Sequence, residues 1–296
     1  MSDRFGSTST SQRSDMADNS LDREETFRGP FLRSPLIAPV SSLAYRWYAQ
    51  QLKQEVVGKP LPKHIALIAD GNRRFAKKLG LSETSEGHRY GAEKVNQVVE
   101  WCDELEIPAV TLWVLSTDNL DRSADELERF FDLLREQLAS VSSGQSNRPL
   151  RRQVRAVGRL DLLPEDVRRG IEEAEHSTAE DGEHRLNIAI AYGGRDEILY
   201  AFKQMLRSRA DKGESVEDIA DKLSPEDIQP YLYAPDLPEP DLIVRTSGEV
   251  RLGGFLLWQS VYSELYFSDS LWPAFRKIDF LRAIRSYQQR DRRQGR

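Results

Sequence analysis

HIALIADGNRRFAKKL, at residues 64–79, is the segment that decides the fold. Its first six residues, His64–Ala69, form a short apolar run typical of a buried strand. The polar turn DGNRR follows at residues 70–74, and a helical pattern continues from about Arg73 to Leu79. A strand that passes through a tight turn into a helix is a building unit of α/β proteins.

The same succession of short apolar strands and amphipathic helices recurs along the chain. It predicts a single α/β domain with a central, mostly parallel sheet flanked by helices. Further strands are expected at residues 109–115, 152–157, 185–191 and 241–245, and helices at 43–57, 87–105, from Ser123 to Leu138, 164–177 and 195–208.

The N-terminus has a different composition. Residues 1–40 are mostly polar and predict a disordered tail, so the folded domain is expected over residues 41–296. The first 20 residues lack the apolar stretch of a secretory signal. The chain has no apolar run of roughly 20 residues, which a membrane span needs. Cys102 is the single cysteine, which excludes an intramolecular disulfide and a multi-thiolate zinc site. We expect a cytoplasmic protein.

The charge balance excludes some partners. Lys and Arg total 42 against 48 Asp and Glu, a net charge of −6, which argues against a general nucleic-acid binder. The sequence lacks the G-x-x-x-x-G-K-[ST] loop of P-loop NTPases, the G-x-G-x-x-G turn of dinucleotide-binding proteins and H-E-x-x-H. Its four histidines are too scattered to predict a zinc site.

Polar residues follow the predicted strands, where α/β proteins bind ligands. Asp70 and the arginines of DGNRR suit a phosphate and a hard cation, although an ordinary strand–turn–helix junction is an equal alternative. STDN at residues 116–119 and Arg122 are a second such group, or a helix cap. RTSGEVR at residues 245–251 suits a diphosphate. Glu264 lies in an apolar run and needs an arginine, a backbone donor or a metal. Together these strand ends predict a ligand with several phosphates.

The longer motifs identify a resemblance. HIALIADGNRRFAKKLG, GHRYGAEKV, LSTDNLDR, NIAIAYGGRDEI, DLIVRTSGEVRLGGFLLWQSVYSELYF and LWPAF occur in this order. Over residues 61–295 the chain resembles the cis-prenyltransferases, the undecaprenyl diphosphate synthase-like enzymes. The resemblance implies a homodimer that uses Mg²⁺ and condenses isopentenyl diphosphate with an allylic diphosphate, geranyl or farnesyl. A new Z double bond forms and diphosphate leaves.

The resemblance also implies roles for single residues. Asp70 would coordinate Mg²⁺ and assist departure of the allylic diphosphate, and Ser116 and Asn119 would take part in catalysis. Glu264 would be the second acid near Mg²⁺, and Arg293 would reach the partner subunit's active site. The implied substrate-binding residues, with Gly253 in place of a common Ser and Phe75 in place of a common Trp, are Gly71, Asn72, Arg73, Arg74, Phe75, His88, Asp118, Arg122, Arg245, Glu249, Arg251 and Gly253.

Product length stays open at this point. Several motifs resemble the short-chain actinobacterial enzymes that make Z,E-farnesyl diphosphate, and Val114 and Leu115 match positions that limit the tunnel. The alternatives are a long-chain undecaprenyl or decaprenyl synthase, an inactive partner subunit of such a synthase, and a phosphate-binding regulatory module. A membrane-soluble product would also be compatible with loose peripheral contact with a membrane.

Overall fold

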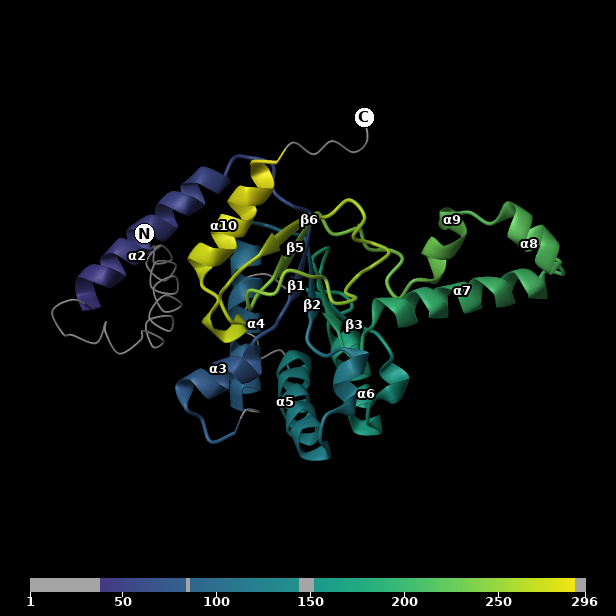
Figure 1. Ribbon diagram of the computed structural model, residues 1–296, viewed down its shortest axis with the longest axis horizontal. Coiled ribbons are helices and arrows are strands. Elements are labelled where there is room, and N and C mark those ends of the chain that lie inside the picture. Colours follow the sequence, from purple (N-terminus) through teal and green to yellow (C-terminus); the bar gives the residue numbers. More distant parts are fainter. Residues whose placement is uncertain (1–37, 84–85, 144–151, 291–296) are drawn as a thin grey trace, which may run out of the picture.

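The computed structural model describes residues 38–83, 86–143 and 152–290 (Figure 1). Its centre is one six-stranded sheet in the order β3-β4-β2-β1-β5-β6, in which every neighbouring pair is parallel. The predicted α/β fold is therefore confirmed. The strands are β1 (His64–Ile68), β2 (Ala109–Trp113), β3 (Gln153–Val157), β4 (Arg185–Ala189), β5 (Leu242–Arg245) and β6 (Glu264–Phe267).

Helices connect these strands and cover the sheet. They are α2 (Ala38–Val56), α3 (Asn72–Leu79), α4 (Glu86–Glu104), α5 (Ala124–Ser142), α6 (Glu165–Ser177), α7 (Gly194–Asp211), α8 (Val216–Lys222), α9 (Pro225–Ile228) and α10 (Lys277–Gln288), with short 3₁₀ turns that include η3 (Thr117–Asp121) and η6 (Trp272–Ala274).

Helix α2 begins at Ala38, three residues before the predicted start of the folded domain. Pro39 lies in its first turn, where a proline is accommodated. Residues 1–37 of the predicted tail lie outside the described part of the chain.

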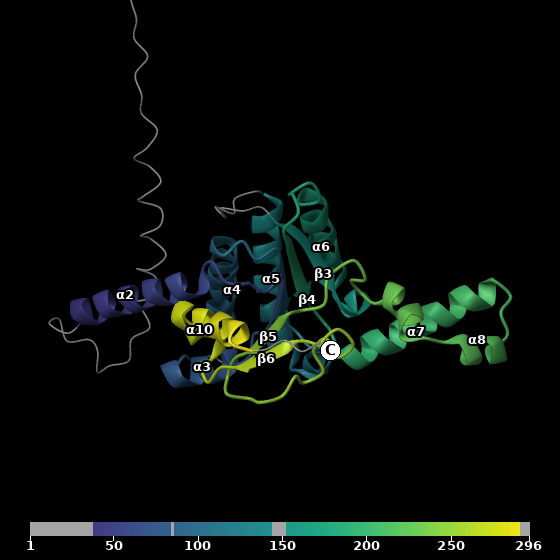
Figure 2. The ribbon, with the colours of Figure 1, turned by 90° about the horizontal axis from the view of Figure 1, so that it is seen from above.

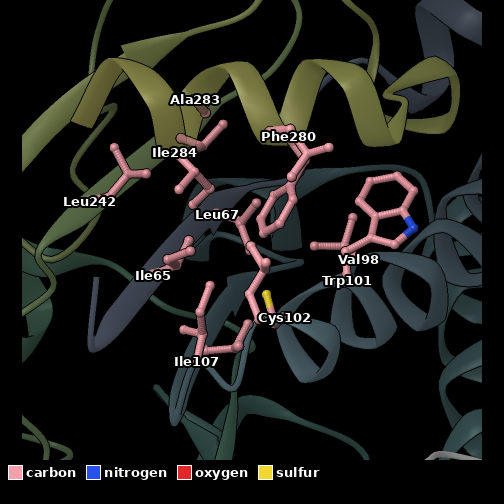
Figure 3. Close-up of a cluster of buried hydrophobic side chains, with 14 of the residues drawn as sticks. Ile65, Leu67, Val98, Trp101, Cys102, Ile107, Leu242, Phe280, Ala283 and Ile284 are labelled. Atoms are coloured by element: carbon pink, nitrogen blue, oxygen red, sulfur yellow. The ribbon is translucent and has the colours of Figure 1, made fainter. Parts of the chain in front are cut away.

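The core lies mainly between the sheet and the helices on one of its faces. Alternate strand residues such as Ile65, Leu67 and Leu242 pack there against α4 and α10, with Trp101 and Phe280 among the contacts (Figure 3). The opposite strand face packs against Tyr192 and the segment around Phe255. Both faces are therefore covered, as a parallel sheet requires.

Helices α7, α8 and α9 form an arm. Figures 1 and 2 show α7 leading away from the body of the molecule, with α8 and α9 folded back beside it. Ala201, Met205 and Ile219 belong to a small apolar cluster of the arm's own.

Candidate active site

The carboxyl ends of the neighbouring strands β1 and β5 meet at Asp70. Arg245 Nη2 donates a hydrogen bond to Asp70 Oδ2 at 2.9 Å, and Ser247 Oγ donates to the same oxygen at 2.8 Å. Arg74, in the first turn of α3, lies 3.3 Å from this oxygen. The Asp70 side chain is still 32% exposed. A carboxylate is thus held by several donors at the molecular surface.

The surroundings of Asp70 keep it charged. Burial opposes ionisation, but the hydrogen bonds from Arg245 and Ser247 and the charges of Arg245 and Arg74 outweigh it and lower the pKa of Asp70. The group is therefore an anion near neutral pH. An ionised carboxylate of this kind is a ligand that a hard divalent cation prefers.

Two unusual backbone conformations build this corner. Gly71 has φ 112°, and a Cβ atom there would lie 2.9 Å from Leu271 Cδ2, so no other residue fits without movement. Ser247 has φ 88°, in the left-handed region that a serine rarely adopts. Its strained backbone holds the hydroxyl on Asp70, and such strain is typical of functional sites.

Helix α3 presents two cations beside Asp70. Arg73 and Arg74 are exposed, whereas Phe75 is buried and its ring lies 5.6 Å from that of Tyr90, edge to face. The structure thus places the arginines where an anion can reach them and uses Phe75 to seat the helix. Asn72 differs from both, because its Oδ1 is buried without a hydrogen-bond partner beside an apolar cavity.

The end of β2 brings Ser116 and Asn119 together. Ser116 Oγ caps η3 by accepting a hydrogen bond from Asn119 N at 3.2 Å, and Asn119 Nδ2 also donates to this hydroxyl. Asp118, in the same turn, is exposed. The segment is therefore a helix cap at a strand end, and its part in binding a ligand stays a prediction.

A group of ionisable side chains lies close to the end of β2 and consists of His88, Arg122 and Glu126. Glu126 Oε1 lies 3.2 Å from Arg122 Nη1 and 3.8 Å from His88 Nε2. Burial, with the nearby charges of Arg122 and Arg73, lowers the pKa of His88 to about 4 despite the opposing charge of Glu126. Burial also lowers the pKa of Arg122. His88 is therefore neutral at physiological pH.

The loop after β5 holds a second basic group. Arg245 is buried, and its Nη1 donates to the carbonyl oxygen of Arg251 at 2.6 Å. Glu249 pairs with Arg251 and lies 3.6 Å from Arg74, so it joins the two strand ends. Gly253 has φ 63°, and a Cβ atom there would lie 3.2 Å from Arg245 Nη1. The absence of a Cβ atom at Gly253 therefore leaves room for the Arg245 guanidinium.

An apolar cavity begins beside Asp70 and runs between the sheet and helices α4, α5 and α6. Its volume is about 130 Å³. Ala69, Asn72, His88 and Trp272 lie at the end near Asp70, and Val114 is part of the wall. Charged groups at the strand ends thus lie beside a cavity whose lining is mostly apolar.

Two predicted residues, Leu115 and Glu264, are placed away from this group. Leu115 does not line the cavity but is buried in the cluster of α5 and α6. Glu264 pairs in register with Leu242 at the opposite edge of the sheet, five residues or roughly 16 Å along the strands from Asp70, and forms an ion pair with Arg290. Within one subunit Glu264 and Asp70 therefore cannot share an ion. Arg293 lies outside the described residues.

The residues present fit one Mg²⁺ only in part. Asp70 is ionised and half-exposed, as a ligand should be, but no group of three or more His, Cys, Asp or Glu lies close enough to hold a metal among the residues that the structure describes. Mg²⁺ usually takes one or two carboxylates together with substrate phosphates. Asp70 therefore suits an ion that arrives with a diphosphate.

The strand ends hold contacts that the sequence did not single out. Thr246 Oγ1 lies 2.8 Å from the carbonyl oxygen of Asp70, and Ser247 donates to the Asp70 carboxylate. Their signal was present in the hydroxyl-rich turn RTSG, but its partner is 175 residues or more away in sequence. Only the parallel pairing of β1 with β5 brings them together.

The fold and site define an α/β protein with a cluster of arginines and acids at the carboxyl edge of a parallel sheet and an apolar cavity beside it. Residues 68–295 match the family model described as "Putative undecaprenyl diphosphate synthase". The chain belongs to this prenyltransferase family. It is therefore a prenyltransferase of isoprenoid biosynthesis, as the motifs predicted.

Individual relatives agree with this assignment. The chain is 50% identical over 254 residues to an isoprenyl transferase of Thermus thermophilus, covering 85% of this chain and 95% of the relative. It is 48% identical over 258 residues to a "tritrans,polycis-undecaprenyl-diphosphate synthase (geranylgeranyl-diphosphate specific)" of Methanopyrus kandleri, covering 85% and 91%. A lavandulyl diphosphate synthase from Lavandula x intermedia, solved with dimethylallyl diphosphate, matches with TM-score 0.74 and 31% identity over 80% of this chain and 99% of that one.

Proposed function

We propose that the protein is a Mg²⁺-dependent cis-prenyltransferase that extends an allylic diphosphate with isopentenyl diphosphate to a short product of the Z,E-farnesyl type. The observation that carries this proposal is the position of the apolar cavity directly beside Asp70. The allylic tail enters the cavity, and its diphosphate lies between Asp70, Arg73 and Arg74. Isopentenyl diphosphate binds at Arg245 and Arg251.

The reaction breaks the bond between the allylic carbon and its diphosphate and forms a carbon–carbon bond to isopentenyl diphosphate. The proton that isopentenyl diphosphate loses as the new double bond forms passes to the released diphosphate. Arg74 and Arg73 stabilise the negative charge that develops on the leaving diphosphate. When bound, Mg²⁺ would neutralise part of the same charge. The apolar wall at Val114 excludes water from the cationic carbon. Asn119 and Ser116 face the reacting carbons from the end of β2.

The size of the cavity supports a short product. Its lining spans five residues from Leu186 on β4 to Ile190 just after it, about 13 Å. On α5 it spans twelve residues, from Phe130 to Val141, about 16 Å. An extended farnesyl chain has twelve main-chain carbons, which span roughly 14 Å at ordinary bond lengths. An undecaprenyl chain is several times longer.

We also propose that the enzyme is a homodimer in the cytoplasm with loose membrane contact. Leu199 and Phe202 lie three residues apart on α7 and are exposed, which supports a subunit interface there. Leu43 and Trp47, exposed on α2, support contact with a lipid surface. No helix in the described ranges is long and apolar enough to span a bilayer.

The activity is tested with purified full-length protein, radiolabelled isopentenyl diphosphate and either geranyl or farnesyl diphosphate. We expect label to enter the organic phase with Mg²⁺ and to stay in the aqueous phase with EDTA. Absence of label transfer under both conditions would favour an inactive partner subunit. Binding of diphosphates without turnover, unchanged in Asp70→Ala, would favour a regulatory module.

A further inference from the structure

The turn η3, which contains Asn119 and is capped by Ser116, has little core of its own. None of its residues from Thr117 to Asp121 is buried, and Leu120 packs only partly against the cluster of α5 and α6. The hydrogen bonds between Ser116 and Asn119 are internal to the turn and move with it. The position of these two side chains therefore depends on what holds the turn from outside.

The segment that joins β4 to α7 holds this turn. Tyr192 N donates to the carbonyl oxygen of Leu115 at 3.1 Å, and Thr117 N donates to that of Tyr192 at 3.2 Å, which extends the parallel pairing of β2 with β4 past the strand ends. A side-chain contact follows, because Thr117 Oγ1 donates to Asp196 Oδ2 at 3.1 Å. Asp196 lies in the first turn of α7, where the helix dipole favours a carboxylate. A side chain of η3 is thus tied to a helix 79 residues further along the chain.

Gly193 makes room for this hydrogen bond. A Cβ atom at Gly193 would lie 2.6 Å from Asp196 Oδ2 and 2.7 Å from Thr117 Oγ1, the two atoms that the bond joins. The backbone of Gly193 has φ −141° and ψ 127°, an extended conformation that any residue adopts. The glycine is therefore needed for space and not for its backbone conformation. This is a second, independent sign that the fold is built around the contact of Thr117 with Asp196.

The first turn of α7 also holds the loop after β5. Gly194 N donates to the carbonyl oxygen of Gly254 at 2.9 Å, and a Cβ atom at Gly194 would lie 2.4 Å from that oxygen. Gly254 follows Gly253, which lies against the Arg245 guanidinium. The same helical turn therefore contacts two polar parts of the site, η3 through Asp196 and the arginine-bearing loop through Gly194.

This helical turn is itself fixed to the body of the molecule. Glu197 is 1% exposed, and its Oε1 accepts hydrogen bonds from Tyr233 N and from Gln259 Nε2, each at 3.1 Å. Tyr192 Oη donates to the other oxygen of this carboxylate. Because Glu197 is held by three donors, the neighbouring Asp196 has a fixed place from which it can hold η3.

We infer that Asp196 is a positioning residue that, through the hydroxyl of Thr117, holds the end of β2 in place for the reaction. This inference rests on the proposed function and adds Thr117 and Asp196 to it, neither of which needs to touch the substrate. Without their hydrogen bond η3 shifts, and Ser116 and Asn119 meet the reacting carbons in the right geometry less often, which lowers kcat. The arginines that hold the diphosphates lie on other elements, so KM is little affected.

Paired substitutions separate the hydrogen bond from the bulk of each side chain. Thr117→Val keeps the shape of threonine but has no hydroxyl, whereas Thr117→Ser keeps the hydroxyl. Asp196→Ala removes the acceptor, whereas Asp196→Asn keeps an acceptor oxygen and nearly the same size. Asp211→Ala, at the exposed far end of the same helix, is the matched control.

Steady-state kinetics of the purified full-length variants are measured with Mg²⁺, isopentenyl diphosphate and geranyl diphosphate. We expect Thr117→Val and Asp196→Ala each to lower kcat by about tenfold and to leave both KM values within about twofold of the wild-type values. Thr117→Ser, Asp196→Asn and Asp211→Ala should retain most of the wild-type kcat. The double variant Thr117→Val/Asp196→Ala should be no slower than the slower single variant, because both changes remove the same hydrogen bond.

Three results would overturn the positioning role. The first is a kcat close to that of the wild type in both Thr117→Val and Asp196→Ala. The second is a loss of activity in Thr117→Val that Thr117→Ser shares to the same extent, since the hydroxyl would then be irrelevant. The third is a loss that appears as a raised KM at unchanged kcat, which would assign the pair to substrate binding.

Hydrogen exchange in the ligand-free protein tests the same contact without catalysis. We expect the backbone amides of residues 117–121 to exchange about tenfold faster in Thr117→Val than in the wild type, and at an unchanged rate in Asp211→Ala. Unchanged exchange in a folded Thr117→Val variant would contradict the positioning role. If the wild-type protein transfers no isopentenyl diphosphate at all, the proposed function fails instead, and the exchange rates still decide whether the contact holds η3.

Discussion

At the scale of single residues, Asp70 collects more interactions than any other group at the strand ends. It accepts from Arg245 and Ser247 and lies beside Arg74. Asp70→Asn removes the negative charge while keeping the size of the side chain. We expect kcat to fall by about 10²–10³, a loss comparable to removing one preorganised electrostatic contact, with the fold intact by circular dichroism.

Asp221→Asn, on the exposed surface of α8, serves as its control. Asp70→Asn with more than half of the wild-type kcat would show that the carboxylate has no part in the reaction.

His88 gives a second prediction at this scale. Since burial and neighbouring cations lower its pKa to about 4, it stays neutral down to about pH 5 in the ligand-free protein. An NMR titration of the histidine side chains, with His88→Asn for assignment, should show one ring whose midpoint lies well below those of exposed histidines. A midpoint near 6.5 for His88 would contradict the burial seen in the structure.

The same depressed pKa has a consequence for stability. The unfolded chain takes up a proton at His88 near pH 6.5, whereas the folded chain takes it up near pH 4. The free energy of unfolding is therefore unaffected by this proton above pH 6.5 and falls as the pH is lowered toward 4. We expect the free energy of unfolding to fall by about 3 kcal/mol more over this range in the wild type than in His88→Asn. Urea unfolding at pH 4.5 and pH 7 measures the difference.

At the scale of elements, alanine substitutions at two glycines inside helices are expected to change the free energy of unfolding in opposite directions. A Cβ atom at Gly91, in α4, would lie 2.4 Å from Asn72 Oδ1, whereas one at Gly170, in α6, meets Leu138 at an ordinary 3.5 Å. We expect Gly91→Ala to lower the free energy of unfolding by about 1–3 kcal/mol. Gly170→Ala should raise it by about 0.5–1 kcal/mol, because alanine favours helix. A Gly91→Ala variant as stable as Gly170→Ala would refute the close packing of α3 on α4.

The elements also show what the sequence could predict. The strand HIALIA and the helix after it lie where the pattern placed them, because local apolar spacing and turn residues determine both. The proximity of Ser247 to Asp70 was beyond reach, since it depends on which strands become neighbours. The separation of Glu264 from Asp70 within one subunit was beyond reach for the same reason, because β6 starts at the opposite edge of the sheet. Leu115 follows the end of β2 at Trp113, so the alternation of the strand did not decide whether its side chain would line the cavity or join the cluster of α5 and α6.

At the scale of the whole molecule, the arm of α7, α8 and α9 bears on the proposed dimer. Leu199, on α7, is 52% exposed, and Leu79, at the end of α3, is 47% exposed. We expect sedimentation equilibrium to give twice the 33.9 kDa of one chain. A negative charge at a buried apolar contact is costly, so Leu199→Glu should sediment as a monomer and Leu79→Glu as a dimer. A dimer that survives Leu199→Glu would place the interface elsewhere.

The positively charged side chains and the apolar cavity lie next to each other, an arrangement that suits the proposed chain growth. The arginines at the strand ends lie at the mouth, and the cavity beneath leads away from them toward Gln137. The net charge of −6 conceals this local excess of positive groups. An anionic substrate is therefore compatible with an acidic protein.

The most direct test is the length and double-bond configuration of the product made by the purified protein from isopentenyl diphosphate and geranyl diphosphate with Mg²⁺. We predict a product with one new Z double bond and a main length of fifteen carbons, matched to the roughly 13–16 Å cavity. Products well beyond C20 would contradict the short-chain assignment, and a new E double bond, or no condensation, would contradict the proposed reaction itself.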